Sequence, residues 1–326
     1  MNIIITNIGR RGYLVDYFKA ALGAGGRVYS SDCDATASGL YGNCDGYFIL
    51  PKPVDDEEKY VSTLINVCLK NNINAVIPII DPEIYILSGY QERFAEAGIR
   101  VVVSDRRVLD ICYDKLKMNA FLEECGFPTA QTFSTLDEFE AAYDKGLIKT
   151  PVIIKPILGS GSVETYIVED IEKARALFKP GMIIQELLKG CEYGADVFNS
   201  FEGEPLRCVV KRKISMRSGE TDKSISVHEP GIEASLKKLS KELKHVGNLD
   251  CDIILCDGRA YIIDMNPRFG GGYPATHAIG VDLAYILCQL LKGEIIRPEF
   301  GKYEEGILVM KEISIRSVKM KELLKQ

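Results

Sequence analysis

Two aspartates and an asparagine in the last third of the chain have the types and spacing to bind a divalent cation. Asp264 and Asn266 lie two residues apart at the end of an apolar, β-branched run, and Asp252 lies in an apolar run upstream. Side chains alternate along a strand, so Asp264 and Asn266 should share one face, with Ile263 and Met265 on the other. Carboxylate and amide oxygens suit Mg²⁺, which keeps several waters and accepts phosphate oxygens.

The turn between the two acidic strands decides whether their carboxylates meet. A two-residue turn at Asp257-Gly258 would leave Asp252 on the opposite face from Asp264. A three-residue loop, 257–259, would place the two directly across from each other and suits a glycine in the left-handed conformation. Facing carboxylates repel, and a cation beside them would relieve the repulsion. We therefore expect the three-residue loop and a Mg²⁺ site, with Mn²⁺ as an alternative ion.

Arg268 lies two residues after Asn266, close enough in sequence to reach a phosphate bound at the metal site. Pro267 fixes the backbone before it, and its planar guanidinium can bind a phosphate or an acyl-phosphate with two parallel hydrogen bonds. The glycines Gly270-Gly-Gly272 come directly after. An exposed acidic hairpin with a glycine-rich loop is the alternative interpretation, and the combined motif favours the catalytic one.

Hydrophobic patterning predicts the elements that hold these residues. In the first third, β-branched runs alternate with helical patterns, which is typical of a doubly wound parallel sheet. Its expected strands are 1–7, 27–31, 46–50, 75–80 and 100–103, and its expected helices are 13–22, 56–72 and 83–97.

The rest of the chain predicts an α+β arrangement in two parts. Asp114 is a good N-cap for a helix that ends before Gly126-Phe-Pro128. The first part has expected strands 131–133, 151–155, 165–168 and 182–186 with helices 135–144 and 170–178; the second has strands 192–200, 206–215, 249–255 and 259–265 with helices 231–246 and 281–292. The domains should therefore span 1–105, 106–189 and 190–326.

Composition excludes several classes of function. The chain has 40 Lys and Arg against 46 Asp and Glu, and a net charge of −6 argues against a nucleic-acid partner. The longest apolar runs, about eight residues, are far shorter than the ~20 needed to span a membrane. Ten scattered cysteines without a CxxC pair indicate reduced thiols, and three distant histidines disfavour zinc. A cytoplasmic protein is expected.

The acidic strands resemble a known family. A carboxylate strand followed by Asp-Met-Asn-Pro-Arg is similar to the metal-binding strands of the ATP-grasp superfamily, in its carbamoyl-phosphate-synthase-like and biotin-carboxylase-like branch. The resemblance covers roughly residues 1 to 295, because the first domain looks like the Rossmann-like pre-ATP-grasp domain that precedes a two-lobed ATP-grasp fold. Both carboxylate positions are Asp here where many relatives have Glu, so the ions can be shifted or bound through water.

The resemblance implies further ATP-binding residues, which the chain supplies in the expected order. Lys115 and Lys155 match two phosphate-directed basic positions, although a Walker A motif is absent. The remaining matches are the triphosphate loop Gly159, Ser160, Gly161 and Ser162, the adenine hinge Glu186, Leu187 and Leu188, and the ribose acceptor Glu192. A plain hairpin turn is the alternative for the loop, and a buried strand with a surface acid is the alternative for the hinge.

The family chemistry that follows is the transfer of a phosphoryl group from ATP to a small carboxylate, followed by attack of an amine. Lys155 and Arg268 would be the catalytic cations, with ATP and Mg²⁺ as cofactors, and the family suggests a homodimer. Phosphorylation of bicarbonate or carbamate, as in carbamoyl phosphate synthesis, is disfavoured because only one ATP-grasp unit is present. A non-catalytic ATP sensor is disfavoured because every phosphate- and metal-facing position has suitable chemistry.

Three segments are candidates for substrate binding. In the basic stretch 211–217, Arg212 or Arg217 can bind a carboxylate, or the stretch is a solvated strand edge. Asp81 and Glu83 follow a buried strand at its carboxyl end, where doubly wound sheets bind ligands. The loop Gly9-Arg-Arg-Gly12 lies at a similar end and either holds an anion or is an ordinary entry to a helix. The identity of both substrates and the role of residues 301–326 stay open.

Overall fold

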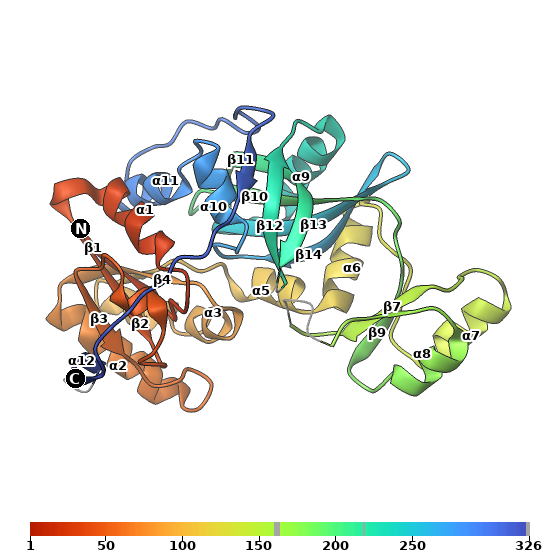
Figure 1. Cartoon of the computed structure of the whole chain (residues 1–326), viewed down its shortest axis with the longest axis horizontal. Coiled ribbons are helices and arrows are strands. Elements are labelled where there is room, and N and C mark those ends of the chain that lie inside the picture. Colours follow the sequence, from red (N-terminus) through yellow and green to blue (C-terminus); the bar gives the residue numbers. More distant parts are fainter. Residues whose placement is uncertain (160–163, 218, 324–326) are drawn as a thin grey trace.

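The computed structural model describes residues 1–159, 164–217 and 219–323, with three sheets of different architecture (Figure 1). The predicted loop residues Ser160, Gly161 and Ser162 lie outside the described residues. We call the three parts the N-terminal unit, the small lobe and the large lobe. We propose that their boundaries fall near residues 105 and 189, where the chain leaves one sheet for the next.

The N-terminal unit contains a parallel sheet in the order β3-β2-β1-β4-β5. Its central strand reads Ile-Ile-Ile and is buried on both faces, as expected for a strand covered by helices on each side. The predicted doubly wound sheet is confirmed. The strands are β1 (Asn2–Thr6), β2 (Arg27–Asp32), β3 (Gly46–Ile49), β4 (Ile73–Pro78) and β5 (Arg100–Val101), and short 3₁₀ turns lie at Gly23–Gly25 and Ser38–Tyr41.

Helices cover both faces of this sheet. One face packs against α1 (Tyr13–Leu22) and against α11 (Leu283–Leu291), which comes from the large lobe, so the two parts share a core. The other face packs against α2 (Glu57–Lys70), α3 (Asp81–Ser88), α4 (Gln91–Glu96) and α5 (Arg106–Tyr113). The single helix predicted over 83–97 is wrong, because the chain turns at Gly89 and Tyr90 between α3 and α4.

The small lobe is an antiparallel sheet in the order β6-β9-β7-β8 with its own core. It follows α6 (Lys115–Glu124), whose N-cap is Asp114 as predicted: the carboxylate accepts hydrogen bonds from the backbone N–H groups of Leu116 and Lys117. Its elements are β6 (Thr132–Phe133), α7 (Leu136–Asp144), β7 (Val152–Pro156), β8 (Tyr166–Val168), α8 (Ile171–Leu177) and β9 (Met182–Glu186).

The large lobe is a second antiparallel sheet, in the order β14-β13-β10-β11-β12-β15. One face is apolar and packs on α6 and α9, while the other carries polar residues toward the interior of the molecule. Its elements are β10 (Cys191–Asn199), β11 (Pro205–Arg217), β12 (Glu220–Ser226), α9 (Pro230–Leu243), β13 (Gly247–Cys256), β14 (Arg259–Asn266), α10 (Tyr273–Ala278) and β15 (Leu308–Met310).

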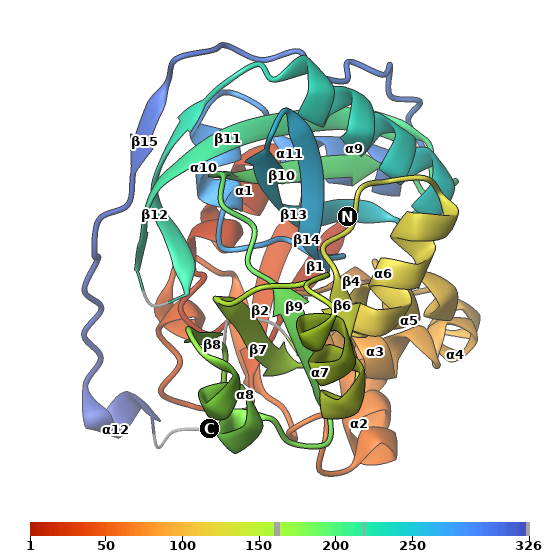
Figure 2. The same ribbon diagram turned by 90° about the vertical axis from the view of Figure 1, so that its right-hand side faces the viewer.

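The C-terminal segment runs from the large lobe back to the N-terminal unit. After β15 at the sheet edge, the chain passes along the outside of the molecule to a last turn of helix, α12 (Met320–Leu323) (Figure 2). All ten cysteines are free thiols. Among the residues that the structure describes, no helix is long and apolar enough to cross a membrane.

Candidate active site

The two acidic strands form a hairpin that places Asp252 directly opposite Asp264. The predicted three-residue loop is wrong, because Cys256 pairs with Arg259 and leaves a two-residue turn. Asp257 and Gly258 both have positive φ, 49° and 72°, as a type I′ hairpin turn requires. Asp252 and Asp264 therefore face each other as expected, although the turn between their strands is one residue shorter than predicted.

A β-bulge makes this facing possible. Ile253 pairs with Ile262, whereas its neighbour Asp252 pairs with Asp264, so Ile263 is the extra residue on β14. Ile262 and Met265 both belong to the core beneath the sheet, and Ile263 between them is half-buried. Without the bulge, the two-residue turn would have placed the carboxylates on opposite faces.

The donor set of this centre fits Mg²⁺ held partly by phosphates and water. The amide nitrogen of Asn266 donates to Asp264 Oδ2 at 3.0 Å, and the amide oxygen of Asn266 is the atom that can bind a metal. Burial and the nearby Asp252 raise the pKa of Asp264, while Lys115 and Lys155 oppose that shift. No cluster of three or more His, Cys, Asp or Glu residues forms a metal site within the described ranges. Two carboxylates and an amide suit an ion that completes its shell with other oxygens.

Two lysines of β11 lie on the sheet face that carries Asp252, and sequence reasoning missed both. Lys213 Nζ lies 2.6 Å from Asp252 Oδ1. Lys211 is buried and donates to Asp196 and, at 2.6 Å, to the hydroxyl oxygen of Thr276. In the sequence Lys211-Arg212-Lys213 the two lysines must share one face of the strand, and this alternation is the signal that could have identified them.

Arg212 faces away from these carboxylates, so its assignment as a substrate ligand is wrong. It pairs with Tyr193, which lies in the core on the opposite face of the sheet. Lys211 shares the face of Gly194, which in turn lies opposite Asp252. Arg217 lines a cavity between the large sheet and the N-terminal unit and lies 3.3 Å from Asp222.

Arg268 is held between the large lobe and the N-terminal unit. Its Nε donates to Asp81 Oδ1 at 2.8 Å, and its Nη1 lies 3.6 Å from Asp250 Oδ2. Burial disfavours the charged guanidinium, but Asp81 and Asp250 outweigh burial and raise its pKa. Asp81, expected to contact substrate, thus orients Arg268. Sequence reasoning also missed Asp250, which lies two residues before Asp252 and shares its face.

Glu83 is not a substrate ligand, because its side chain is fully buried beneath the N-terminal sheet. It accepts a hydrogen bond from the Tyr60 hydroxyl and has no exposed surface. Burial raises its pKa to about 6. A carboxyl in that position supports packing between α2 and α3 and cannot reach a ligand in the cleft.

The two predicted phosphate-binding lysines lie near Asp264. Lys115, at the start of α6, donates to the carbonyl oxygen of Gly159 at 2.6 Å, and burial lowers its pKa. Lys155, on β7, has its pKa lowered to about 8 by burial and then by the charge of Lys115. Gly159 has a φ of +107°, a conformation open only to glycine without strain. Two cations in a partly desolvated position are suited to binding a polyphosphate.

The predicted hinge joins the two lobes. β9 ends at Glu186, and the half-buried Leu187 and Leu188 lead toward β10. Glu192 is exposed near the start of β10, on the same face as Gly194 and Asp196. The large-lobe acidic face and the hinge therefore lie along one continuous segment of chain.

Comparisons with known proteins agree with this geometry. Residues 3–102 match the model described as PylC-like, N-terminal domain, and residues 112–272 match the ATP-grasp domain. A carbamoyl-phosphate synthase of Methanobrevibacter smithii is 25% identical over 304 residues, which cover 87% of this chain and 78% of that protein.

Solved structures share the fold. The biotin carboxylase domain of Hydrogenobacter thermophilus 2-oxoglutarate carboxylase, solved with MgADP, ADP and bicarbonate, has a TM-score of 0.73 at 18% identity, covering 94% of this chain and 73% of that chain. An L-amino acid ligase of Bacillus licheniformis has a TM-score of 0.65 at 20% identity, covering 91% and 77%. With its facing aspartates, Asn266 and Arg268, the chain carries an ATP-grasp domain over residues 112–272, preceded by a PylC-like N-terminal domain over residues 3–102.

Proposed function

We propose that this centre transfers the γ-phosphoryl group of ATP to a small carboxylic acid, and that an amine then attacks the acyl-phosphate. The observation that carries the proposal is the placement of Asp252 opposite Asp264, with Asn266 beside them and Arg268 in the adjoining loop. Phosphoryl transfer needs positioning and neutralisation of charge more than a covalent role for the protein.

Each cation has a separate role in this scheme. Mg²⁺, held by Asp252, Asp264 and Asn266, would neutralise the phosphate oxygens during transfer. Lys115 and Lys155 bind the polyphosphate from the small lobe. Arg268 offers its guanidinium to the acyl-phosphate, and its contact with Asp81 fixes its orientation.

The amine step needs no nucleophilic side chain. The nitrogen lone pair of the amine forms a bond to the carbonyl carbon, the bond from carbon to the phosphate oxygen breaks, and phosphate leaves with that electron pair. The amine loses one proton to solvent. The hinge Glu186–Leu188 would hold the adenine through its backbone, and Glu192 would accept hydrogen bonds from the ribose.

A phosphate-release screen tests the proposal. The protein is incubated with Mg²⁺-ATP and pooled amino acids and other small carboxylic acids, with Asp264→Asn as the control. We expect ATP turnover that depends on one acid and is lost in the control. ATP binding without turnover for any acid would instead favour a sensor.

Bicarbonate is the second candidate acid, because a carbamoyl-phosphate synthase is among the relatives. The same screen with bicarbonate and ammonia tests this reaction. Carbamoyl phosphate as the product would identify it. Turnover with an organic acid but not with bicarbonate would exclude it.

Assembly and location complete the proposal. The similar biotin carboxylase domain is described as a dimer, and we propose a homodimer for this chain. Light scattering after gel filtration should give twice the 36.2 kDa mass of one chain. We also propose a cytoplasmic location, which fractionation of the source cells would test.

A further inference from the structure

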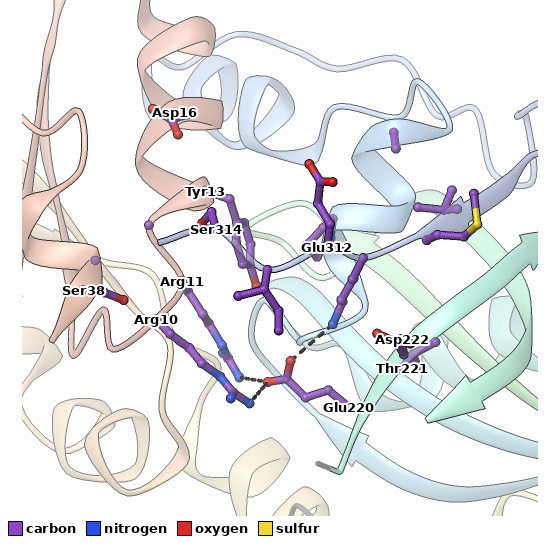
Figure 3. A pocket seen from close by; sticks show the side chains of 18 of the residues that line it. Arg10, Arg11, Tyr13, Asp16, Ser38, Glu220, Thr221, Asp222, Glu312 and Ser314 are labelled. Carbon is purple, nitrogen blue, oxygen red and sulfur yellow. Dashed lines mark hydrogen bonds and ion pairs between the residues drawn. The ribbon is translucent and has the colours of Figure 1, made fainter. Parts of the chain in front are cut away.

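A large cavity lies between the N-terminal unit and the large lobe, apart from the acidic centre (Figure 3). Its volume of about 790 Å³ is within the usual range for small-molecule sites. The Gly9–Gly12 loop forms one wall, β12 forms another, and the C-terminal segment 309–316 forms a third. The cavity therefore needs the part of the chain whose role sequence reasoning left open.

Three cations converge on one carboxylate inside this cavity. Glu220 lies 3.2 Å from Lys311, 3.6 Å from Arg10 and 3.9 Å from Arg11. Although burial opposes its charge, Lys311 and the two arginines lower the pKa of Glu220, so it stays ionised. Arg10, Arg11 and Lys311 carry three positive charges and Glu220 carries one negative charge, so this cation cluster has a net charge of about +2 for a ligand. Of the other acids labelled in Figure 3, Asp16 and Glu312 lie away from Glu220, and Asp222 is paired with Arg217 at 3.3 Å.

The position of the two arginines fits a ligand site of the N-terminal sheet. Their loop follows β1, and the guanidinium of Arg11 donates at 3.1 Å to the carbonyl oxygen of Ile79, just after β4. β1 lies in the sheet between β2 and β4, so these two loops flank the point where the strand order reverses. Doubly wound sheets bind ligands at that point. Arg11 is anchored there, whereas the Arg10 side chain is 68% exposed and free to meet a ligand.

A thin wall separates the cavity from the acidic centre. A Cβ atom on Gly270 would lie 1.9 Å from Asp250 Oδ2, and one on Gly271 would lie 2.7 Å from Glu220 Cδ. The glycines after Arg268 thus pass between the two sites with no room for side chains. Thr221 lines both the cavity and a water-sized hollow of about 20 Å³ beside Asp252. A ligand in the cavity therefore lies next to the place where an acyl-phosphate would form.

We propose that this cavity binds the amine substrate through an anionic group, a carboxylate or a phosphate, held by Arg10, Arg11 and Lys311. The assignment rests on the proposed ligase function and names the class of the second substrate: an amine that also carries a negative charge. The anion lies among the cations, and the amine points past Thr221 toward the acyl-phosphate. Lys311 gives the C-terminal segment a role, since it brings one of the three cations.

The test uses hydroxylamine, a small uncharged nucleophile that traps an acyl-phosphate as a hydroxamate without needing an anion site. The full chain is given Mg²⁺-ATP, the acid found by the phosphate-release screen and hydroxylamine, and the hydroxamate of that acid is measured by mass spectrometry. Four amines are added in competition as two matched pairs, L-alanine with L-alaninamide and O-phosphoethanolamine with ethanolamine. The first pair tests a carboxylate and the second a phosphate.

In at least one pair, the anionic amine should halve hydroxamate formation at a concentration roughly tenfold lower than its partner, a difference of about 1.4 kcal/mol. In the variants Arg10→Gln and Lys311→Gln, most of the tenfold difference between the two amines of a pair should disappear. The two concentrations are compared within the same variant. The matched controls Arg175→Gln and Lys302→Gln change surface cations in other ion pairs and should keep the tenfold difference.

The outcomes separate the two proposals. Equal concentrations within both pairs for the wild type, or a ratio that survives both cavity variants, would overturn the anion site while leaving the ligase intact. A wild type that forms no hydroxamate with any acid would overturn the ligase itself, and the amine site with it.

Discussion

Replacing Asp264 with asparagine should stabilise the metal-free protein and abolish the extra stability that Mg²⁺-ATP provides. Asp264 faces Asp252 across neighbouring strands, and burial together with Asp252 raises its pKa. Two unit charges about 5 Å apart, a usual separation for directly opposed side chains, repel by about 3 kcal/mol at an effective dielectric constant of 20. Lys115 and Lys155 offset much of this repulsion. We expect a net gain of about 1 kcal/mol in the free energy of unfolding.

The difference in the free energy of unfolding between Asp264→Asn and the wild type should change sign once Mg²⁺-ATP is present. At a hundredfold excess over the dissociation constant, the ligand stabilises the wild type by about 2.7 kcal/mol. Asp264→Asn keeps an oxygen that can accept from Asn266 but loses the charge that holds the cation, so most of this gain should vanish. The wild type is then the more stable protein with ligand, and the variant is the more stable one without it.

Urea unfolding followed by circular dichroism, with EDTA or with excess Mg²⁺-ATP, measures both differences. Tyrosine fluorescence is a second probe, since the chain has 16 tyrosines and no tryptophan. Asp257→Asn is the matched control: it removes the same charge at the exposed turn of the same hairpin and should change neither difference by more than about 0.5 kcal/mol. A clear loss of stability for Asp264→Asn without metal would refute the repulsion argument. Equal stabilisation of both proteins by Mg²⁺-ATP would refute its role as a metal ligand.

Three further predictions concern other buried groups. Burial lowers the pKa of Lys155 to about 8, so ATP binding slightly above that pH should take up a proton; calorimetry in two buffers of different ionisation enthalpy should detect the uptake, and Lys155→Met should abolish it. Burial raises the pKa of Glu83 from 4.5 to about 6, which stabilises the fold below pH 4.5 and is lost as the pH rises through 6; Glu83→Gln should flatten urea stability over that window. Gly270→Ala should cost about 2 kcal/mol or more because its Cβ would overlap Asp250, whereas Gly231→Ala, in an open part of α9, should be neutral or stabilising by up to ~1 kcal/mol in urea unfolding.

Local patterns were enough to predict most of the strands and helices, although some, such as α5, α10 and β15, were missed. They failed at the hairpin, where Asp257-Gly258 is a strong signal for a two-residue turn. That turn alone would place the carboxylates on opposite faces, and the bulge at Ile263 brings them back to the same face. A bulge in an apolar run has no clear signature, because either neighbouring isoleucine can be the extra residue.

Contacts between distant segments were the other limit. Asp81 and Arg268 are 187 residues apart, and nothing in the sequence near either one indicates that they pair. Sequence reasoning could have grouped Lys211 with Lys213, because alternation along a strand places both on one face and Arg212 on the other. The register of the strands then decides which of these faces carries Asp252. The bidentate chemistry of arginine favoured Arg212 as a carboxylate ligand, but its pairing with Tyr193 places it on the other face.

The N-terminal unit is part of the candidate active site, because three kinds of contact join it to the large lobe. The cores merge where α1 packs on α11. Arg11 donates to the carbonyl oxygen of Phe269 at 3.1 Å, and Asp81 binds Arg268 one residue earlier. Since the segment 268–272 contacts both the acidic strands and the cation cluster, the N-terminal unit sets the position of the very loop that lies between them. The guanidinium that would meet the acyl-phosphate and the one that would meet the amine substrate are thus positioned by the same sheet, at the carboxyl ends of β1 and β4.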